Sequence, residues 1–464
     1  MARTLALVLS LLLAAGVAAG DQSPLATFLL ADQRTLDDTR ELTASIGPRL
    51  TGSAAYERAA EWSAQRLRAA GLDRVMLEPF TLGRGWEREL ARARIIAPID
   101  QMLHVAALGW TPSTAEGGVE GDVVALTDLA PETIARRTSL RGRIVLLPDG
   151  ERGGTPDRIN AARRELDARL RDAGVRALLS ADGAPDNVLS ARDRVYGGTI
   201  SALPAAQIGR EDAQTIRRLL NRGPIRIAIE LRNRITDAPV TVHNVVGELR
   251  GRERPDEWVI LGAHLDSWDF SAAAQDNATG VAMVLAAARA IAARELRPRR
   301  SIRFALWGGE EQGQLGSSAY VRAHGSELDR AIATLNSDAG TGRIIGWTTP
   351  GRADVMSAVR QLMHEVLDDL GSGSLDRSMQ YAFQSDGAPF ILAGVPTLDL
   401  NADDSKYEDI HHRPTDTIER VDARNLTIGA ATVAATAFAI ADAPKRIAPH
   451  LEPEAVRRLL KRAE

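Results

Sequence analysis

Short apolar runs in the C-terminal half of the sequence constrain the fold more than any other feature. Three such runs cover 257–263, 301–307 and 331–335, and stretches with helical periodicity at 279–291 and 315–323 separate them. A strand that is apolar at every position is buried on both faces, because helices cover both sides of its sheet. The regular alternation therefore predicts an α/β fold.

The region before these runs divides into a helical segment and a block of different texture. Residues 24–72 are predicted to be helical, and 75–80 suit a strand. From about residue 105, short strands alternate with Gly- and Pro-containing turns, and two amphipathic helices follow. We interpret residues 105–238 as a separate inserted module. The catalytic domain would then consist of 21–104 and 239–464.

The N-terminus has the features of a secretory signal peptide. Residues 1–20 contain one basic residue, a short apolar core and small residues at the expected cleavage site. The apolar run is shorter than the about 20 residues that a membrane span requires. We therefore expect an exported protein, periplasmic or extracellular, with no membrane span in the mature chain.

Composition excludes several kinds of site. The chain has no cysteine, so disulfides, thiolate metal ligands and cysteine nucleophiles are ruled out. The formal net charge of −4 gives no electrostatic reason to expect nucleic acid as a partner. A metal site in this chain must therefore use imidazole and carboxylate ligands.

Polar residues with suitable chemistry follow the predicted strands, where the loops of an open α/β sheet converge. Imidazole and carboxylate groups without thiolates suit zinc. Two His and three carboxylates can seat two Zn²⁺ ions if one carboxylate bridges them, and such a pair can activate water and polarise a carbonyl together. The candidate residues, in chain order, are His264, Asp276, Glu310, Glu311, Asp338 and His412.

Adjacent acids in a loop point in different directions, so they can take different roles. We assign Glu311 to the metal and Glu310 to the general base, which would take a proton from the attacking water and pass it to the leaving amine. Asp276 is the best candidate for the bridge. Asp266 is predicted to orient the imidazole of His264 by a hydrogen bond, and Asp416 could do the same for His412.

These residues lie in segments that resemble the co-catalytic zinc exopeptidases, a family of aminopeptidases and glutamate carboxypeptidases. The resemblance is closest to the plasma glutamate carboxypeptidase branch, whose characterised members are dipeptidases. It implies a mixed β-sheet flanked by helices, with a protease-associated-type domain inserted at 105–238. The segments that carry the resemblance are 47–53, 264–269, 310–313, 337–340 and 407–417.

The resemblance also divides the ligands between the ions. It implies that His264, Asp276 and Asp338 hold one Zn²⁺, and that Asp276, Glu311 and His412 hold the other. His411 is an alternative to His412, but the family ligand stands four residues before the acid that is Asp416 here, which selects His412.

Three further expectations follow from the resemblance. Some members stabilise the oxyanion with a tyrosine before a Ser-Asp pair, and Tyr381 is the candidate here, although its spacing from Ser385 is not a clean match. The nearest branch implies a homodimer. The substrate is expected to be a peptide with a free N-terminus.

The sequence leaves the substrate length open. A dipeptidase and an aminopeptidase for longer peptides would share all of these residues. Two more distant alternatives are a single-zinc glutaminyl cyclase, which the metal count would distinguish, and a non-catalytic binding protein. The second is disfavoured because the chain retains every ligand of the pattern.

Overall fold

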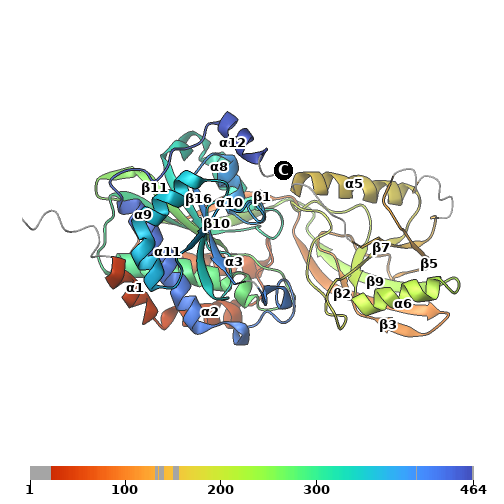
Figure 1. Cartoon of the computed structure of the whole chain (residues 1–464). Coiled ribbons are helices and arrows are strands. Elements are labelled where there is room, and N and C mark those ends of the chain that lie inside the picture. Colours follow the sequence, from red (N-terminus) through yellow and green to blue (C-terminus); the bar gives the residue numbers. More distant parts are fainter. Residues whose placement is uncertain (1–21, 131–133, 135–139, 150–155, 404, 462–464) are drawn as a thin grey trace, which may run out of the picture.

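The computed structural model describes residues 22–130, 134, 140–149, 156–403 and 405–461. The predicted signal peptide at 1–20 lies outside these residues. The chain forms two lobes side by side, each with its own eight-stranded sheet (Figure 1). We call the larger one the catalytic lobe and the other the second lobe.

The sheet of the catalytic lobe is mixed, and its strand order is β1-β10-β12-β11-β13-β16-β14-β15. β11 pairs in parallel with both β12 and β13, whereas β1, β10 and β14 run antiparallel to neighbours. The strands are β1 (Arg74–Leu82), β10 (Val240–Leu249), β11 (Arg254–His264), β12 (Arg300–Trp307), β13 (Ala331–Asn336), β14 (Ile344–Thr348), β15 (Ser374–Asp376) and β16 (Thr397–Ala402).

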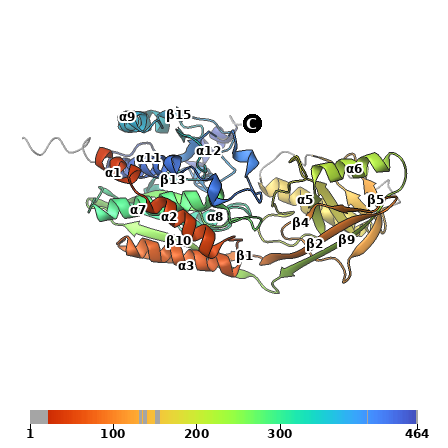
Figure 2. The same ribbon diagram turned by 90° about the horizontal axis from the view of Figure 1, so that it is seen from below.

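Apolar side chains of β11 are buried on both faces of the sheet, as its sequence predicts. Val259 and Leu261 belong to one core cluster, and Trp258 and Ile260, which alternate with them, belong to another. Helices cover both faces (Figure 2). They are α1 (Gln22–Leu30), α2 (Arg34–Glu41), α3 (Ala54–Ala69), α7 (Thr279–Ala293), α8 (Leu315–Ala323), α9 (Ala353–Asp369), α10 (Gly387–Leu392), α11 (Ala423–Asp442) and α12 (Pro453–Leu460).

The long apolar helix α11 belongs to the protein core. Within the described residues it is the one helix long and apolar enough to cross a membrane, but 78% of its most apolar window is buried inside the protein. It packs against α1, α7 and the sheet. Burial of this kind is typical of a core helix.

The predicted helical stretch at 24–72 is interrupted. A π-helical turn at Leu42–Ile46 ends at Gly47, which has φ +78, and α3 begins only after residue 53. Gly47 and Pro48 break the helix because one adopts a left-handed conformation and the other cannot donate a backbone hydrogen bond. The loop between them and α3 carries Arg49 into the core.

The second lobe has a sheet of order β3-β2-β9-β5-β6-β7-β8-β4. It starts at Trp86, not at residue 105 as the sequence suggested, because β2 pairs with β9 along its length. The strands are β2 (Trp86–Ala97), β3 (Gln101–Leu103), β4 (Val105–Ala107), β5 (Val119–Ala125), β6 (Ile144–Leu146), β7 (Ala177–Ala181), β8 (Ala205–Ile208) and β9 (Arg226–Ile235), with helices α5 (Pro156–Asp172) and α6 (Arg210–Leu220).

Candidate metal centre

Parallel pairing in the catalytic sheet brings the candidate residues to one edge. His264 is the last residue of β11, and its partner in the ladder is Trp307, the last residue of β12. Glu310 and Glu311 follow β12, and Asp338 follows β13, which pairs with β11 on its other side. Loops from neighbouring parallel strands meet at this edge, as predicted.

Asp276 lies between two groups of ligands and faces each with one oxygen. It lies in the segment Ala274–Ala278, directly before α7, where its own backbone is non-helical (φ −121, ψ 85). Its Oδ1 is 3.1 Å from His264 Nε2, which is 3.2 Å from Asp338 Oδ1. Its Oδ2 is 3.3 Å from His412 Nε2, which is 2.9 Å from Glu311 Oε2. We call these groups the His264–Asp338 half and the Glu311–His412 half.

These separations suit shared cations. Two donor atoms on one tetrahedral Zn²⁺, each about 2.0–2.1 Å from the metal, lie roughly 3.3 Å apart. The donor atoms of His264, Asp276 and Asp338 all lie within 4.8 Å of one another. Because Asp276 faces both halves, the arrangement could hold two cations with this carboxylate between them.

The alternative ligand His411 lies farther from the cluster than His412. Its Nε2 is 3.9 Å from Asp276 Oδ2, although the donor atoms of Asp276, His411 and His412 are close enough to form a ligand group. His411 stacks on Tyr407, with ring centroids 5.1 Å apart. His412 contacts both Asp276 and Glu311, so the geometry favours it over His411.

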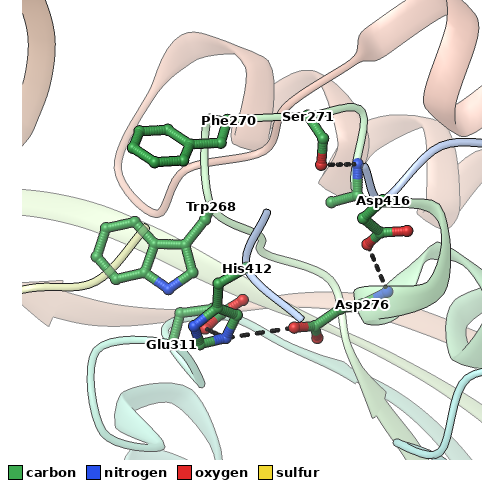
Figure 3. Close-up of a pocket in the computed structure, with 8 residues that line it drawn as sticks. Trp268, Phe270, Ser271, Asp276, Glu311, His412 and Asp416 are labelled. Carbon is green, nitrogen blue, oxygen red and sulfur yellow. Dashed lines mark hydrogen bonds and ion pairs between the residues drawn. The ribbon is translucent and has the colours of Figure 1, made fainter. Parts of the chain in front are cut away.

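A small pocket opens onto the Glu311–His412 half. Figure 3 shows His412, Glu311 and Asp276 pointing toward one another below Trp268. The loop after β11 supplies Trp268, Phe270 and Ser271 to the wall. The wall is therefore apolar on one side and carries metal-ligand chemistry on the other, as small-molecule sites usually do.

Asp266 and Asp416 hold ligand loops, which differs from the predicted roles. The Asp266 carboxylate accepts hydrogen bonds from the backbone N–H groups of Glu310 (3.1 Å) and Glu311 (3.2 Å). Its distance to His264 Nδ1 is 3.7 Å, whereas its own backbone carbonyl lies 3.1 Å from that nitrogen. The carbonyl is therefore the closer of the two groups to the imidazole, and the carboxylate contributes to the raised pKa of His264.

Asp416 acts in the same way on the bridging residue. Its two oxygens accept the N–H groups of Gln275 (2.8 Å) and Asp276 (3.1 Å). The prediction that Asp416 orients His412 is wrong for this structure, because both oxygens are directed at the turn before α7. Each of the two buried aspartates thus fixes two consecutive backbone groups of a loop that carries ligands.

A buried arginine fixes the loop that joins His264 to Asp276. The Arg49 guanidinium is fully buried and donates to the carbonyls of Leu265 (2.8 Å), Ala272 (3.0 Å) and Ala273 (3.0 Å). These carbonyls lie beside His264 at one end of the loop and before Asp276 at the other. Arg49 therefore sets the separation of two ligands without touching either.

Glu310 is buried beside both halves. Glu310 is 8% exposed, and its Oε1 accepts a hydrogen bond from Gln314 Nε2 at 3.1 Å. Burial raises the pKa of Glu310 well above its usual range, and the nearby Asp386, Asp338 and Glu311 carboxylates add to the shift. A carboxylate that holds a proton readily suits a general base.

The charge balance of the cluster fits a cationic occupant. Burial lowers the pKa of His264 and of His412, but the carboxylates around them outweigh this effect and raise both pKa values well above the ordinary range. Burial raises the pKa of Glu311 to about 7, and among the described residues its Oε1 has no hydrogen-bond partner. A divalent cation would therefore compete with protons for the imidazole nitrogens and carboxylate oxygens of this cluster.

The structure does not bring Tyr381 to this cluster. The residue is 58% exposed, and its hydroxyl accepts a hydrogen bond from Gln380 Nε2 at 2.9 Å. None of its described contacts involves Glu310 or a candidate ligand. The predicted oxyanion role has no geometric support here.

Two buried carboxylates near the site were missed by the sequence reasoning. Asp386 accepts a hydrogen bond from Ser317, and burial raises its pKa to about 8. Asp193 comes from the second lobe, and burial raises its pKa to about 7. Asp386 was visible in the Ser-Asp pair considered for Tyr381, but no sequence signal connects Asp193 with ligands more than 70 residues away.

Comparisons with known proteins agree on one family. The model of peptidase family M28 matches residues 244–437. Carboxypeptidase Q of Rattus norvegicus is 30% identical over 404 residues, which are 86% of this chain and 84% of the relative. This match shows that the similarity extends well beyond the region covered by the family model.

Solved structures share the whole architecture. A peptidase M28 precursor from Shewanella amazonensis SB2B superposes with a TM-score of 0.80 at 29% identity, covering 93% of this chain and 98% of that one. A zinc aminopeptidase from Bacillus subtilis, at 22% identity, gives a TM-score of 0.68 and covers 90% and 97%. The latter likeness concerns the fold alone.

Proposed function

Since the chain belongs to peptidase family M28, we propose that it is a di-zinc exopeptidase that hydrolyses the peptide bond after a free N-terminal residue in dipeptides or short peptides. The observation that carries the proposal is the position of Asp276, with one oxygen on His264 and the other on His412. Zinc is the metal named for the aminopeptidase relative of the same fold. The donor set of imidazoles and carboxylates suits it.

We assign His264, Asp276 and Asp338 to one Zn²⁺, and Asp276, Glu311 and His412 to the other. When bound, the ions supply Lewis acidity that polarises the scissile carbonyl and makes water more acidic. Asp266 holds the backbone of Glu310 and Glu311, and Asp416 holds that of Asp276. These hydrogen bonds keep the ligand loops in place while substrate enters and leaves.

Glu310 carries the proton through the reaction. Its carboxylate takes a proton from the attacking water as the water oxygen bonds to the carbonyl carbon. The same group then delivers that proton to the leaving nitrogen as the C–N bond breaks. The products are a carboxylic acid, which keeps the second proton of the water, and an amine, and Glu310 returns to its starting state. Gln314, which donates to Oε1, orients the carboxylate between the two steps.

The substrate class follows from the names of the relatives and from the small pocket. One relative is called a carboxypeptidase and another an aminopeptidase. A dipeptide has a single peptide bond, which is next to both termini, so a dipeptidase satisfies both descriptions. The pocket beside Glu311 and His412 is small and is lined by Trp268 and Phe270, which favours short substrates. Export, which the predicted signal peptide suggests, would place this activity outside the cytoplasm.

The proposal is tested with the zinc-loaded mature protein and two unblocked substrates, a dipeptide and a hexapeptide with the same N-terminal sequence. Release of free amino acids from the dipeptide alone is the expected result. Trimming of the hexapeptide from its N-terminus would instead identify an aminopeptidase with an open cleft. Failure to cleave either peptide, with zinc bound, would contradict the exopeptidase assignment.

A further inference from the structure

A segment of the second lobe contacts the metal centre on one side. Residues 187–201, which we call the interlobe loop, lie between β7 and β8. The N–H of Ala191 donates to the carbonyl of His412 at 2.7 Å, and the N–H of Gly197 donates to the carbonyl of Gln312 at 2.9 Å. The loop thus holds the backbone of the candidate ligand His412 and that of Gln312, the residue after the candidate ligand Glu311.

His412 needs this kind of support. Its backbone has φ +58, a left-handed conformation that is unfavourable for a residue with a side chain. It follows a short 3-10 turn at Tyr407–Asp409, so no regular helix or strand holds it. A neighbouring contact joins Arg413 Nε to Ser190 Oγ of the interlobe loop at 3.4 Å. The second lobe is therefore part of what keeps His412 in place.

The interlobe loop is itself held within the second lobe. Arg194 and Asp167 form a buried ion pair, with Nη2 2.6 Å from Oδ1 and side chains 3% and 0% exposed. Ser201 Oγ donates to the same carboxylate at 2.7 Å. A buried pair with additional hydrogen bonds restricts the loop to one arrangement. Contacts from the loop to the metal centre are therefore contacts to a fixed body.

The same loop places a negative charge next to the Glu311–His412 half. Asp193 is 4% exposed, and the charges that act on it are those of Arg163, Glu311 and His412. Within the part of the chain that the structure describes, Asp193 Oδ2 accepts no hydrogen bond. A buried carboxylate oxygen without a partner is unfavourable unless a positive charge comes close. Arg163 supplies one such charge, and a cation at the Glu311–His412 half would supply a second.

Among the residues that the structure describes, no hydrogen bond connects the side chains of the other half with the second lobe. Among the described hydrogen bonds, those of the His264 and Asp338 side chains come from the catalytic lobe, including the bond from Ser385 Oγ to Asp338 Oδ2 at 2.7 Å. The two halves therefore differ in their dependence on the second lobe.

We propose that the second lobe is a structural part of the metal centre: the interlobe loop positions the Glu311–His412 half, and Asp193 raises the affinity of that half for a divalent cation. Asp193 and Ala191 are both positioning residues, and neither binds the cation. Ala191 acts through its hydrogen bond to His412, and Asp193 acts through its charge beside Glu311 and His412. The inference rests on the proposed two-metal function and assigns a role to the second lobe within it.

The test is a calorimetric titration of the metal-free full chain with Zn²⁺, which separates two binding steps. Asp193→Asn keeps the size of the side chain and removes its charge. We expect the weaker step to lose affinity by roughly tenfold or more, in the range of changes around metal ligands, while the tighter step stays the same. The melting temperature of the metal-free variant is measured as well, because Asp193 also interacts with Arg163, and an unchanged value shows that the interlobe loop keeps its place.

Asp122→Asn is the matched control, since Asp122 lies on β5 of the second lobe, outside the interlobe loop, and pairs with Arg143. It should leave both steps unchanged. Ala191→Pro removes the N–H that bonds to His412 and should weaken the same step as Asp193→Asn. Equal loss in both steps, or no loss in Asp193→Asn, would overturn the inference. If the unaltered chain binds only one Zn²⁺, the proposed two-metal function is wrong. If it binds two and Asp193→Asn changes neither step, only the inference about the second lobe is wrong.

Discussion

The His264–Asp338 half and the Glu311–His412 half of the site present the same donor chemistry on different supports. His264 ends β11 and Asp338 follows the adjacent strand β13, and the His264 side chain is 1% exposed. Glu311 and His412 lie on loops, and the His412 side chain is 22% exposed beside a loop of the second lobe. The comparison teaches that strand ends of one sheet can hold one group of candidate ligands in place. The group on loops also needs contacts with the second lobe.

The largest effect is expected where the two halves meet. Asp276→Ala removes an oxygen from each half, so both ions should be lost together. Activity should fall by more than the about 10²- to 10⁴-fold that loss of a general base costs. Metal analysis of the dialysed variant, compared with Glu310→Gln, checks this. Glu310→Gln should be inactive while it retains its metal; retention of two ions by Asp276→Ala would show that the bridge is unnecessary.

Removing one imidazole at a time should separate the halves. His264→Ala and His412→Ala should each retain one ion, and each should lose more activity than the roughly 10- to 100-fold typical of residues around the ligands. The ion at the more exposed half should leave first when a chelator is added to the unaltered protein. His411→Ala is the control, and it should keep both ions. Loss of one ion from His411→Ala, and none from His412→Ala, would assign the ligand to His411.

The two loop-holding aspartates should differ in what they affect. Asp266→Asn disturbs the backbone of Glu310 and Glu311, so it should lower kcat by about 10- to 100-fold. Asp416→Asn disturbs the turn that carries Asp276, so its main effect should be weaker binding of both ions. Steady-state kinetics together with zinc titration measure the two effects. Identical profiles for the two variants would argue against separate roles.

Arg49 joins the two ends of the loop between His264 and Asp276, and its loss should be seen in stability. Arg49→Met leaves several buried carbonyls without a donor, which should lower the free energy of unfolding by about 2–4 kcal/mol. Arg68→Met is the control, because Arg68 is half exposed and pairs only with Glu61 among its described contacts. Chemical denaturation should show a change of about 0.5 kcal/mol or less for this control.

The smallest effect is expected at Tyr381. Its exposed hydroxyl bonds to Gln380 and lies outside both halves, so Tyr381→Phe should leave kcat within about twofold and stability within about 0.5 kcal/mol. Kinetics with the dipeptide substrate decide the matter. A large fall in kcat with unchanged KM would restore the predicted oxyanion role and would mean that the segment moves when substrate binds.

Sequence reasoning located the sheet of the larger lobe and the candidate ligands at its edge because both depend on local patterns. The apolar runs became β11, β12 and β13 with shifts of a few residues at most, and the α/β class with a mixed sheet is confirmed by the structure and its relatives. Polar residues at the ends of parallel strands must converge, so the sequence order of the ligands was sufficient to place them together.

Contacts between distant segments could not be predicted in the same way. Asp266 and Asp416 were singled out from the sequence for other roles, because their partners are backbone N–H groups that only the folded loops bring into reach. The start of the second lobe was misplaced because β2 has few features of its own and is defined by its pairing with β9. Asp193 reaches the site only because the two lobes are side by side.

The most direct test of the account is the position of the metal in the zinc-loaded Glu310→Gln variant, located by anomalous X-ray scattering at the zinc absorption edge. The account predicts two peaks, one on each side of the Asp276 carboxylate and about 3.5–4 Å apart, as in other two-metal sites. A single peak at His264 and Asp338, with His412 free of metal, would contradict the two-metal centre.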